Sequence, residues 1–159
     1  MTTIHHLTYD DVVEYVTAGL TALGYSTLNP MVNDDAGRTM PLFKPGPVSA
    51  QQLQKLDRGP IVFLQVGGGP GLAVEQILDN VFTSIRAIGP QDDYEFAETL
   101  ALDIDSLMLA ITSNGMIGST NVTCVTRSGG RPALMDFDDA ERYHFQATYV
   151  IQAQTGLVT

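Results

Sequence analysis

The sequence predicts an α+β fold, in which an antiparallel or mixed sheet of four to five strands carries two main helices packed on one face. Residues 142–153 alternate between apolar and polar side chains, a pattern that is typical of a strand with one packed face. Two other segments repeat apolar residues at the spacing of a helix. The predicted order is helix, loop, strand, strand, helix, strand, strand, which suits helices covering one side of a sheet.

The size of the chain predicts a single domain over residues 1–159. Apolar residues make up 44% of the sequence, enough for a folded core and too many for bulk disorder. Cys124 is the only cysteine, so disulfides within the chain cannot hold the fold together. It lies in an alternating segment with no basic neighbour, and we expect a small core residue there and not a reactive thiol.

The first helix is predicted over residues 8–23. Thr8 can accept a hydrogen bond from a free amide of the first turn. Leu7 and Val12 have the spacing of a hydrophobic staple, and an apolar stripe follows. Gly24 suits the C-terminal cap.

Two long loops are predicted, at 29–49 and 67–80. The first contains four prolines and two glycines, and the second opens with a glycine-rich run. A short helix opened by Ser49 is predicted to follow the first loop. Long loops in compact domains are often functional, so we expect these to contact neighbouring subunits. The candidate interface residues are Pro30, Asp34, Asp35, Pro45, Pro47, Gly68, Gly69 and Pro70.

The remaining elements are strands at 60–66, 81–88 and 121–127 and a second helix that begins at Asp92. Asp92 and Glu95 have the spacing of a capping box, and an apolar stripe continues to Ile111. The apolar faces of all elements predict one core. Its members are Val12, Val16, Leu20, Phe63, Ile85, Leu100, Ile104, Leu107, Phe145 and Tyr149.

The sequence contains no motif that supports catalysis, a cofactor or a metal. The glycines at 67–71 lack the lysine of a phosphate-binding loop, and Leu72 stands where a dinucleotide fingerprint needs its third glycine. The carboxylates between Asp136 and Glu141 lack the spacing of a calcium loop. Glu141 and His144 are three residues apart in a predicted strand, which puts them on opposite faces. We therefore expect no enzyme activity and no cofactor.

The chain has 8 basic and 18 acidic residues and a net charge of −10. This balance disfavours nucleic-acid binding, which needs clustered lysine and arginine, and ordinary solubility is sufficient to explain it. No apolar run approaches the length of about 18 residues that spans a membrane. The N-terminus lacks a secretion signal, so we expect synthesis in the cytoplasm.

The layout resembles one known family. A capped helix is followed by a Pro/Gly-rich segment and by the Pro60-Ile-Val-Phe-Leu64 strand, and a second strand ends at Gly89. A long helix with an acidic start and a glycine turn lead to the closing strand, Arg142-Tyr-His-Phe-Gln-Ala-Thr-Tyr149. Over residues 8–153 this arrangement is similar to the tail terminator proteins of long-tailed (siphovirus-type) bacteriophages, particularly those of actinobacteriophages.

The resemblance implies a structural virion protein made in the host cytoplasm. Family members form hexameric rings that cap the tail tube, end its polymerisation and join the tail to the head connector or stopper protein. Six copies at −10 each would carry −60, and an acidic lumen would let the genome pass without sticking. The candidate lumen carboxylates are Asp92, Asp93, Asp136, Asp138 and Asp139.

Two alternatives stay open. The nearer one is another ring of the same neck, a head–tail connector or stopper protein. The more distant one is a small ligand-binding α+β domain that uses the loop at 67–71.

Overall fold

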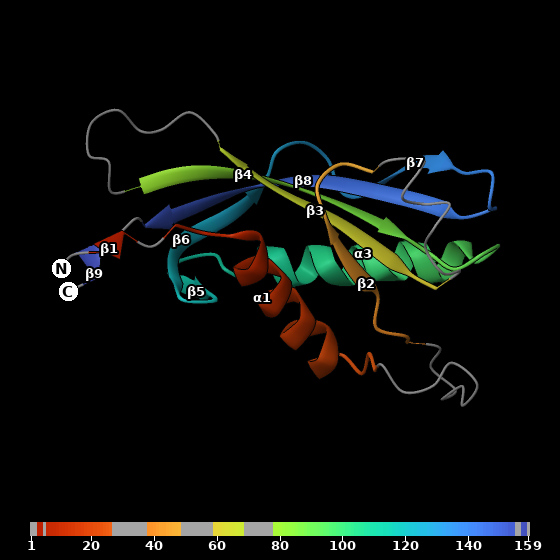
Figure 1. Cartoon of the computed structure of the whole chain (residues 1–159), viewed down its shortest axis with the longest axis horizontal. Coiled ribbons are helices and arrows are strands. Elements are labelled where there is room, and N and C mark those ends of the chain that lie inside the picture. The colour runs from red at the N-terminus through yellow and green to blue at the C-terminus, as the bar shows by residue number, and fades with distance from the viewer. Residues whose placement is uncertain are drawn as a thin grey trace.

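The computed structural model describes residues 3–4, 6–26, 38–48, 59–68, 78–154 and 157–158. It confirms an α+β fold with a mixed sheet and two helices on one face (Figure 1). The sheet has seven strands, more than the four to five predicted. The additional strands are short, and each is held by a long neighbour, so periodicity within five residues or fewer gave little sign of them.

The helices are α1 (Tyr9–Ala22) and α3 (Tyr94–Leu109). The strands of the main sheet are β2 (Leu42–Pro45), β3 (Ile61–Gly68), β4 (Leu78–Ile88), β5 (Gly115–Ile117), β6 (Thr120–Arg127), β7 (Ala133–Phe137) and β8 (Tyr143–Gln154). A separate antiparallel pair joins the two ends of the chain through β1 (Thr3–Ile4) and β9 (Leu157–Val158).

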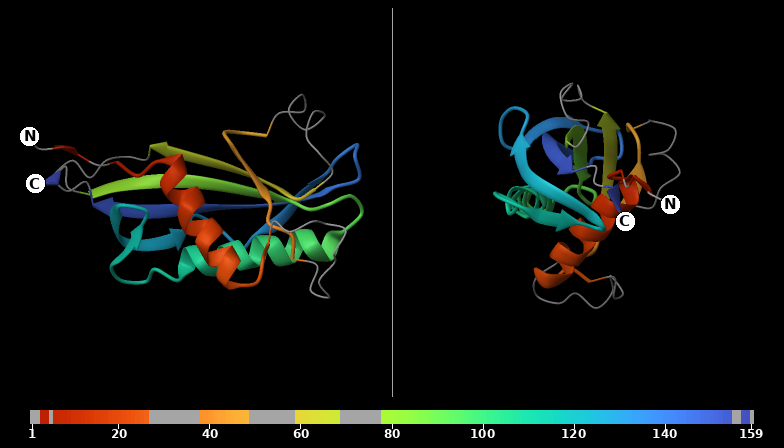
Figure 2. Two further views of the ribbon diagram at one scale, coloured as in Figure 1. Left: turned by 60° about the horizontal axis from the view of Figure 1, so that its bottom comes forward. Right: turned by 90° about the vertical axis from the view of Figure 1, so that its left-hand side faces the viewer.

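The sheet is built around the long pair β4 and β8, which stay in antiparallel register along the whole of β4. The strand order is β2-β3-β4-β8-β6-β5, and only β2 and β3 are parallel. β7 also pairs with β8, beside its first residues, while β6 pairs with its later ones. β6 and β7 therefore follow the same edge of β8, and residues 128–132 link them. The sheet curves into a half-barrel (Figure 2).

Helix α1 begins with the predicted cap. Thr8 accepts a hydrogen bond from the amide of Asp11, and the carboxylate of Asp11 accepts one from the amide of Thr8. The helix crosses α3 closely at Gly19. A side chain there would not fit, because its Cβ would lie 2.5 Å from Cδ2 of Leu107. Leu107 was predicted to be in the core, but it is only half-buried and packs against the core from this crossing.

The capping box predicted for the second helix is wrong by one residue. The N-cap is Asp93, whose Oδ1 accepts a hydrogen bond of 3.0 Å from the amide of Phe96. Asp92 instead lies in the preceding turn with a φ of +55°. The side chain of Asp93, and not that of Asp92, therefore reaches the free amides at the start of the helix.

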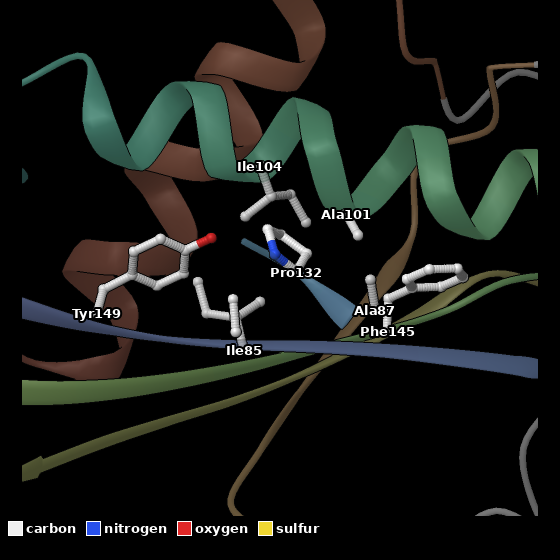
Figure 3. A pocket seen from close by; sticks show the side chains of 8 residues that line it. Ile85, Ala87, Ala101, Ile104, Pro132, Phe145 and Tyr149 are labelled. Carbon is white, nitrogen blue, oxygen red and sulfur yellow. The ribbon is translucent and has the colours of Figure 1, made fainter. Parts of the chain in front are cut away.

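The core lies between the helices and the sheet, and apart from Leu107 all the predicted core residues are buried. Phe63 differs in position, because it lies on the other face of the sheet with Ile61 and Ile88. Under α3, Ile104, Ile85 and other apolar side chains leave a void of only about 10 Å³ (Figure 3). A void needs at least about 10–15 Å³ to admit one water molecule, so this one is a packing defect and no ligand site.

Two segments differ from the predicted pattern. The loop predicted at 29–49 contains β2, which adds to the sheet beside β3. Cys124 is half-buried and not in the core, because a bulge between Val122 and Cys124 shifts the alternation and buries Val125 instead. The short helix predicted after Ser49 lies outside the described residues. Among the described helices, none has the length and apolar character needed to cross a membrane.

Candidate subunit interface

β7 is the most exposed strand of the sheet, and it is rich in large apolar side chains. All five of its residues are exposed, with Leu134 at 48%, Met135 at 58% and Phe137 at 51%. It pairs with β8 on one side, and no other strand among the described residues pairs with its outer edge. An edge of this kind offers free backbone groups and apolar surface together, which favours pairing with another chain.

A cluster of aromatic rings supports the end of β7. The ring of Phe137 lies 4.7 Å from that of Tyr143, and Tyr143 makes an edge-on contact of 5.2 Å with Tyr94. Tyr94 also contacts Phe145 edge-on at 5.4 Å. Tyr94 starts helix α3, so this chain of rings connects the exposed strand to the helix. The apolar surface of β7 is therefore backed by ordered side chains and not by a free loop.

The turn between β7 and β8 is held by one carboxylate. Oδ2 of Asp138 accepts a hydrogen bond from Nε of Arg142 at 3.0 Å and contacts Nε2 of His144 at 2.8 Å. Oδ1 of Asp138 accepts hydrogen bonds from the backbone amides of Ala140 and Arg142. The turn closes tightly, with Glu141 at a φ of +59°. This network fixes the geometry of the hairpin that carries β7.

The environment of Asp138 favours its ionised form. Burial alone would raise the pKa of this carboxyl group, but the hydrogen bonds from His144 and from the Arg142 amide and the charge of Arg142 outweigh it. The pKa of Asp138 therefore lies below its ordinary value. The turn is thus held by a charged carboxylate at neutral pH.

The alternation over residues 142–153 puts Arg142 and His144 on the polar face of the last strand, where water or an interface was expected, yet both side chains are buried within the subunit. Arg142 is 4% exposed and His144 only 1%. His144 lies opposite Ile88 in the register, beside the small apolar cluster that Ile88 forms with Ile61 and Phe63. The second face of the sheet is thus buried at this end, where Arg142 and Nε2 of His144 pair with Asp138, while Nδ1 of His144 has no hydrogen-bond partner among the described residues.

The opposite edge of the sheet is β2, and it lies at the same level as β7. One row of paired residues crosses five strands from edge to edge. It contains Phe43, Val62, Ala87, Phe145 and Leu134. β2 and β7 run in opposite directions, because three antiparallel pairs and one parallel pair separate them.

Like β7, the β2 edge exposes apolar surface. Leu42 is 49% exposed, and no other strand among the described residues pairs with the outer side of β2. Pro45 ends the strand and supplies no amide donor, which limits further pairing to the first residues of β2.

The carboxylates predicted to line a lumen gather at one end of the molecule. The amide of Asp92 donates to the carbonyl of Glu141 at 2.7 Å, which joins the turn before α3 to the β7–β8 turn. Asp92, Asp136 and Asp139 are exposed there. Asp93 is used as the helix cap, and Asp138 is used within the turn. The structure thus gives Asp93 and Asp138 roles inside the subunit, and the lumen role of Asp92, Asp136 and Asp139 stays a prediction.

The predicted interface loops lie only partly within the described residues. Pro45 and Pro47 are exposed at the end of β2, and Gly68 is the last residue of β3, paired with Val81. The loop predicted at 67–80 is thus shorter than expected, since the sheet includes its two ends. The other candidates, Pro30, Asp34, Asp35, Gly69 and Pro70, lie outside the described residues.

The described residues contain no group of three histidine, cysteine or acidic side chains placed to hold a metal ion. A second polar network joins the buried side chains of Asp105 and Tyr149 to Arg127, and it ties α3 to the sheet. Arg127 and Tyr149 both donate hydrogen bonds to the carboxylate of Asp105, which is a structural role.

The strands predicted from the sequence do not include residues 133–137, so the apolar residues of β7 were not among the candidate site residues. The five residues Ala133–Phe137 are a short apolar run between a Gly/Pro turn and an acidic turn, which is itself a weak strand signal. No family model matches the chain, and a search of curated proteins finds no match.

Proposed function

We propose that this protein is the subunit of a homo-oligomeric ring, in which β7 of one copy pairs with β2 of the next. The observation that carries the proposal is the exposed apolar edge at Leu134, Met135 and Phe137. A monomer with such an edge would tend to aggregate, so the edge calls for a partner. Edge pairing supplies main-chain hydrogen bonds and covers the apolar side chains.

The directions of the two edges suit this contact. A copy rotated about an axis roughly along the strands keeps its strand directions, so its β2 would run antiparallel to the β7 beside it. The two edges lie at the same level of the sheet, and pairing would extend the sheet from one copy to the next. A contact between two different patches continues around a ring until the ring closes.

The charges near the two edges are complementary. Residues 133–141, around β7, carry four acidic side chains and no basic one. The described residues 38–48, which include β2, carry the basic side chains Arg38 and Lys44 and no acidic one. Opposite charges at the two patches favour the head-to-tail contact over a symmetric contact of β7 with β7.

Within this proposal, the ring is a hexamer that ends the tail tube of a long-tailed phage and joins it to the head connector. The support is the resemblance of residues 8–153 to tail terminators, together with the net charge of −10. Asp92, Asp136 and Asp139 would face the lumen from one end of the subunit and repel the phosphates of passing DNA.

The ring contact is tested by native mass spectrometry of the purified chain and of two variants. The double variant L134D/F137D puts charges on the β7 edge and should turn the hexamer into monomers. The control M116D changes an apolar residue that is similarly exposed, at 56%, but lies on β5. It should remain hexameric. A monomeric wild-type chain, or a double variant that still forms hexamers, would contradict the proposed contact.

The role in the virion is tested in a phage that lacks the protein. A tail terminator is needed to stop the growth of the tube, so electron micrographs should show separate heads and tails of excessive, irregular length. Unattached tails of normal length would instead identify a connector or stopper of the neck.

A further inference from the structure

A polar pocket of about 190 Å³ lies on the sheet face away from the helices. Three neighbouring strands supply its polar side chains, Gln65 from β3, Ser84 and Arg86 from β4, and Gln146 from β8. A water molecule takes about 30 Å³ in the liquid, so the pocket has room for several waters or one small organic molecule.

The guanidinium of Arg86 is held in a fixed orientation. Oε1 of Gln146 accepts hydrogen bonds from both Nε, at 3.0 Å, and Nη2, at 2.6 Å. The side-chain amide of Gln146 in turn donates to Oγ of Ser84 at 3.1 Å. Gln146 therefore uses one side of the guanidinium fork. The end formed by Nη1 and the second N–H of Nη2 has no acceptor among the described residues.

Arg86 also differs from the other arginines of the sheet in its charge partner. Arg127 binds Asp105 and Arg142 binds Asp138, each through a salt bridge. No carboxylate in the described part of the chain pairs with Arg86, which is half-buried. Within the described part of the chain, this partly desolvated cation is therefore without an anion.

The wall beside the guanidinium is apolar. Phe63 is 2% exposed and contributes to the pocket together with Val48, which packs on the cluster of Ile61, Phe63 and Ile88. The pocket therefore offers a cation with two free parallel donors next to a hydrophobic surface.

We propose that this pocket binds a carboxylate that carries a short apolar body. The free end of Arg86 would take both carboxylate oxygens in a forked pair of hydrogen bonds, since guanidinium and carboxylate match in geometry. The apolar body would lie against Phe63 and Val48. The carboxylate belongs either to a small molecule or to an acidic side chain of another polypeptide, and the two sources have this chemistry in common.

The proposal does not depend on the ring, because every group involved belongs to one subunit. It is tested on the purified chain by ¹⁵N NMR titration with butyrate, acetate and inorganic phosphate. Butyrate should produce saturable shifts at Ser84, Arg86 and Gln146, and it should bind about tenfold more tightly than acetate, because two more methylenes are buried. Phosphate that binds as tightly as butyrate, or butyrate that gives no saturable shift, would overturn the proposal.

Matched variants assign the binding to Arg86. R86Q should lower the affinity for butyrate by about tenfold or more, which is the scale expected when charge-assisted hydrogen bonds are lost. R131Q removes the same charge at an exposed position and should bind butyrate like the wild type. Q146E provides a second test in case R86Q does not fold, because its carboxylate would pair with Arg86 and should abolish binding. Equal butyrate affinity in Q146E and wild type would contradict the site.

The source of the carboxylate is decided by a capped tripeptide with one central glutamate. Tighter binding of the peptide than of butyrate assigns the pocket to an acidic side chain. Tighter binding of butyrate assigns it to a small molecule. A failure of both ligands to bind overturns the pocket while leaving the ring contact untouched, since that is measured separately by mass.

Discussion

The hydroxyl of Tyr149 donates a hydrogen bond of 2.8 Å to Oδ1 of Asp105, and this bond ties the middle of strand β8 to helix α3. Both side chains are buried. Arg127 of β6 donates to the same carboxylate through Nε, at 2.9 Å, and through Nη2. One carboxylate thus links a helix to two strands, in a place where an unpaired charge would be costly.

Removing the Tyr149 hydroxyl should lower stability without changing the packing. Tyr149→Phe keeps the ring and leaves Asp105 with Arg127 alone, so the free energy of unfolding should fall by about 1–2 kcal/mol. Urea unfolding followed by circular dichroism measures the change. Tyr143→Phe is the control, because no hydrogen bond joins the Tyr143 hydroxyl to another described residue, and it should change stability by less than about 0.5 kcal/mol. Equal effects of the two variants would show that the Asp105 bond is not stabilising.

Stability should fall as the pH drops below about 4. The folded state lowers the pKa values of Asp105 and Asp138 below the ordinary 3.8, despite their burial, because hydrogen bonds and nearby arginines favour the charged forms. Below that pH the unfolded chain binds more protons than the folded one. The contribution of these carboxylates is therefore fully present above the ordinary pKa and is lost as the pH falls through the folded values.

The variant D138N tests this pH dependence at one site. It should be less stable than the wild type at pH 7, and the difference should shrink as urea unfolding is repeated at lower pH. The exposed neighbour Asp139 provides the control D139N, which should follow the wild-type curve. A constant difference between D138N and wild type at all pH values would contradict the role of the ionised carboxylate.

Glu141 occupies a backbone conformation that suits glycine, and replacing it should stabilise the β7–β8 turn. Its φ of +59° places it in the left-handed region, which costs a residue with a side chain about 1 kcal/mol or more. Glu141→Gly should raise the thermal midpoint. Glu141→Ala also loses the hydrogen bond from Gln91 but keeps the unfavourable φ, so it should not raise the midpoint. A midpoint that rises equally in both variants would contradict the strain argument.

Gly89 is required where β4 meets helix α3. A Cβ at this position would lie 2.7 Å from Cβ of Ala97 and 3.1 Å from the carbonyl oxygen of Asp93. The helix would have to move, so Gly89→Ala should cost about 1–3 kcal/mol of stability. Gly130→Ala meets no atom within 4 Å and serves as the control. A neutral Gly89→Ala would mean that α3 can shift freely at its first turn.

The sequence alone determined the principal elements of the fold. The helix at 8–23 and the strand at 142–153 agree with the structure within a residue or two at each end, because a repeating contact with the core imposes a periodic pattern on a long element. The same reasoning identified nearly all of the core residues. Side chains such as Val12 and Ile104 lie on the apolar face of their helix, and the spacing of apolar residues in that helix suffices to predict their burial.

Tertiary structure decided the features that depend on a partner distant in sequence. His144 is buried beside Ile88 and Phe63, which belong to β4 and β3 and lie far from it along the chain. The exposed edge of β7 exists because β7 pairs with β8 on one side and with no other described strand on the other. The orientation of Arg86 likewise depends on Gln146 of the neighbouring strand β8. Strand pairing is a contact between remote segments, and five residues carry too little periodicity to reveal it. The long helices and strands could therefore be predicted from the sequence, whereas both candidate sites depend on how the strands pair in the folded chain.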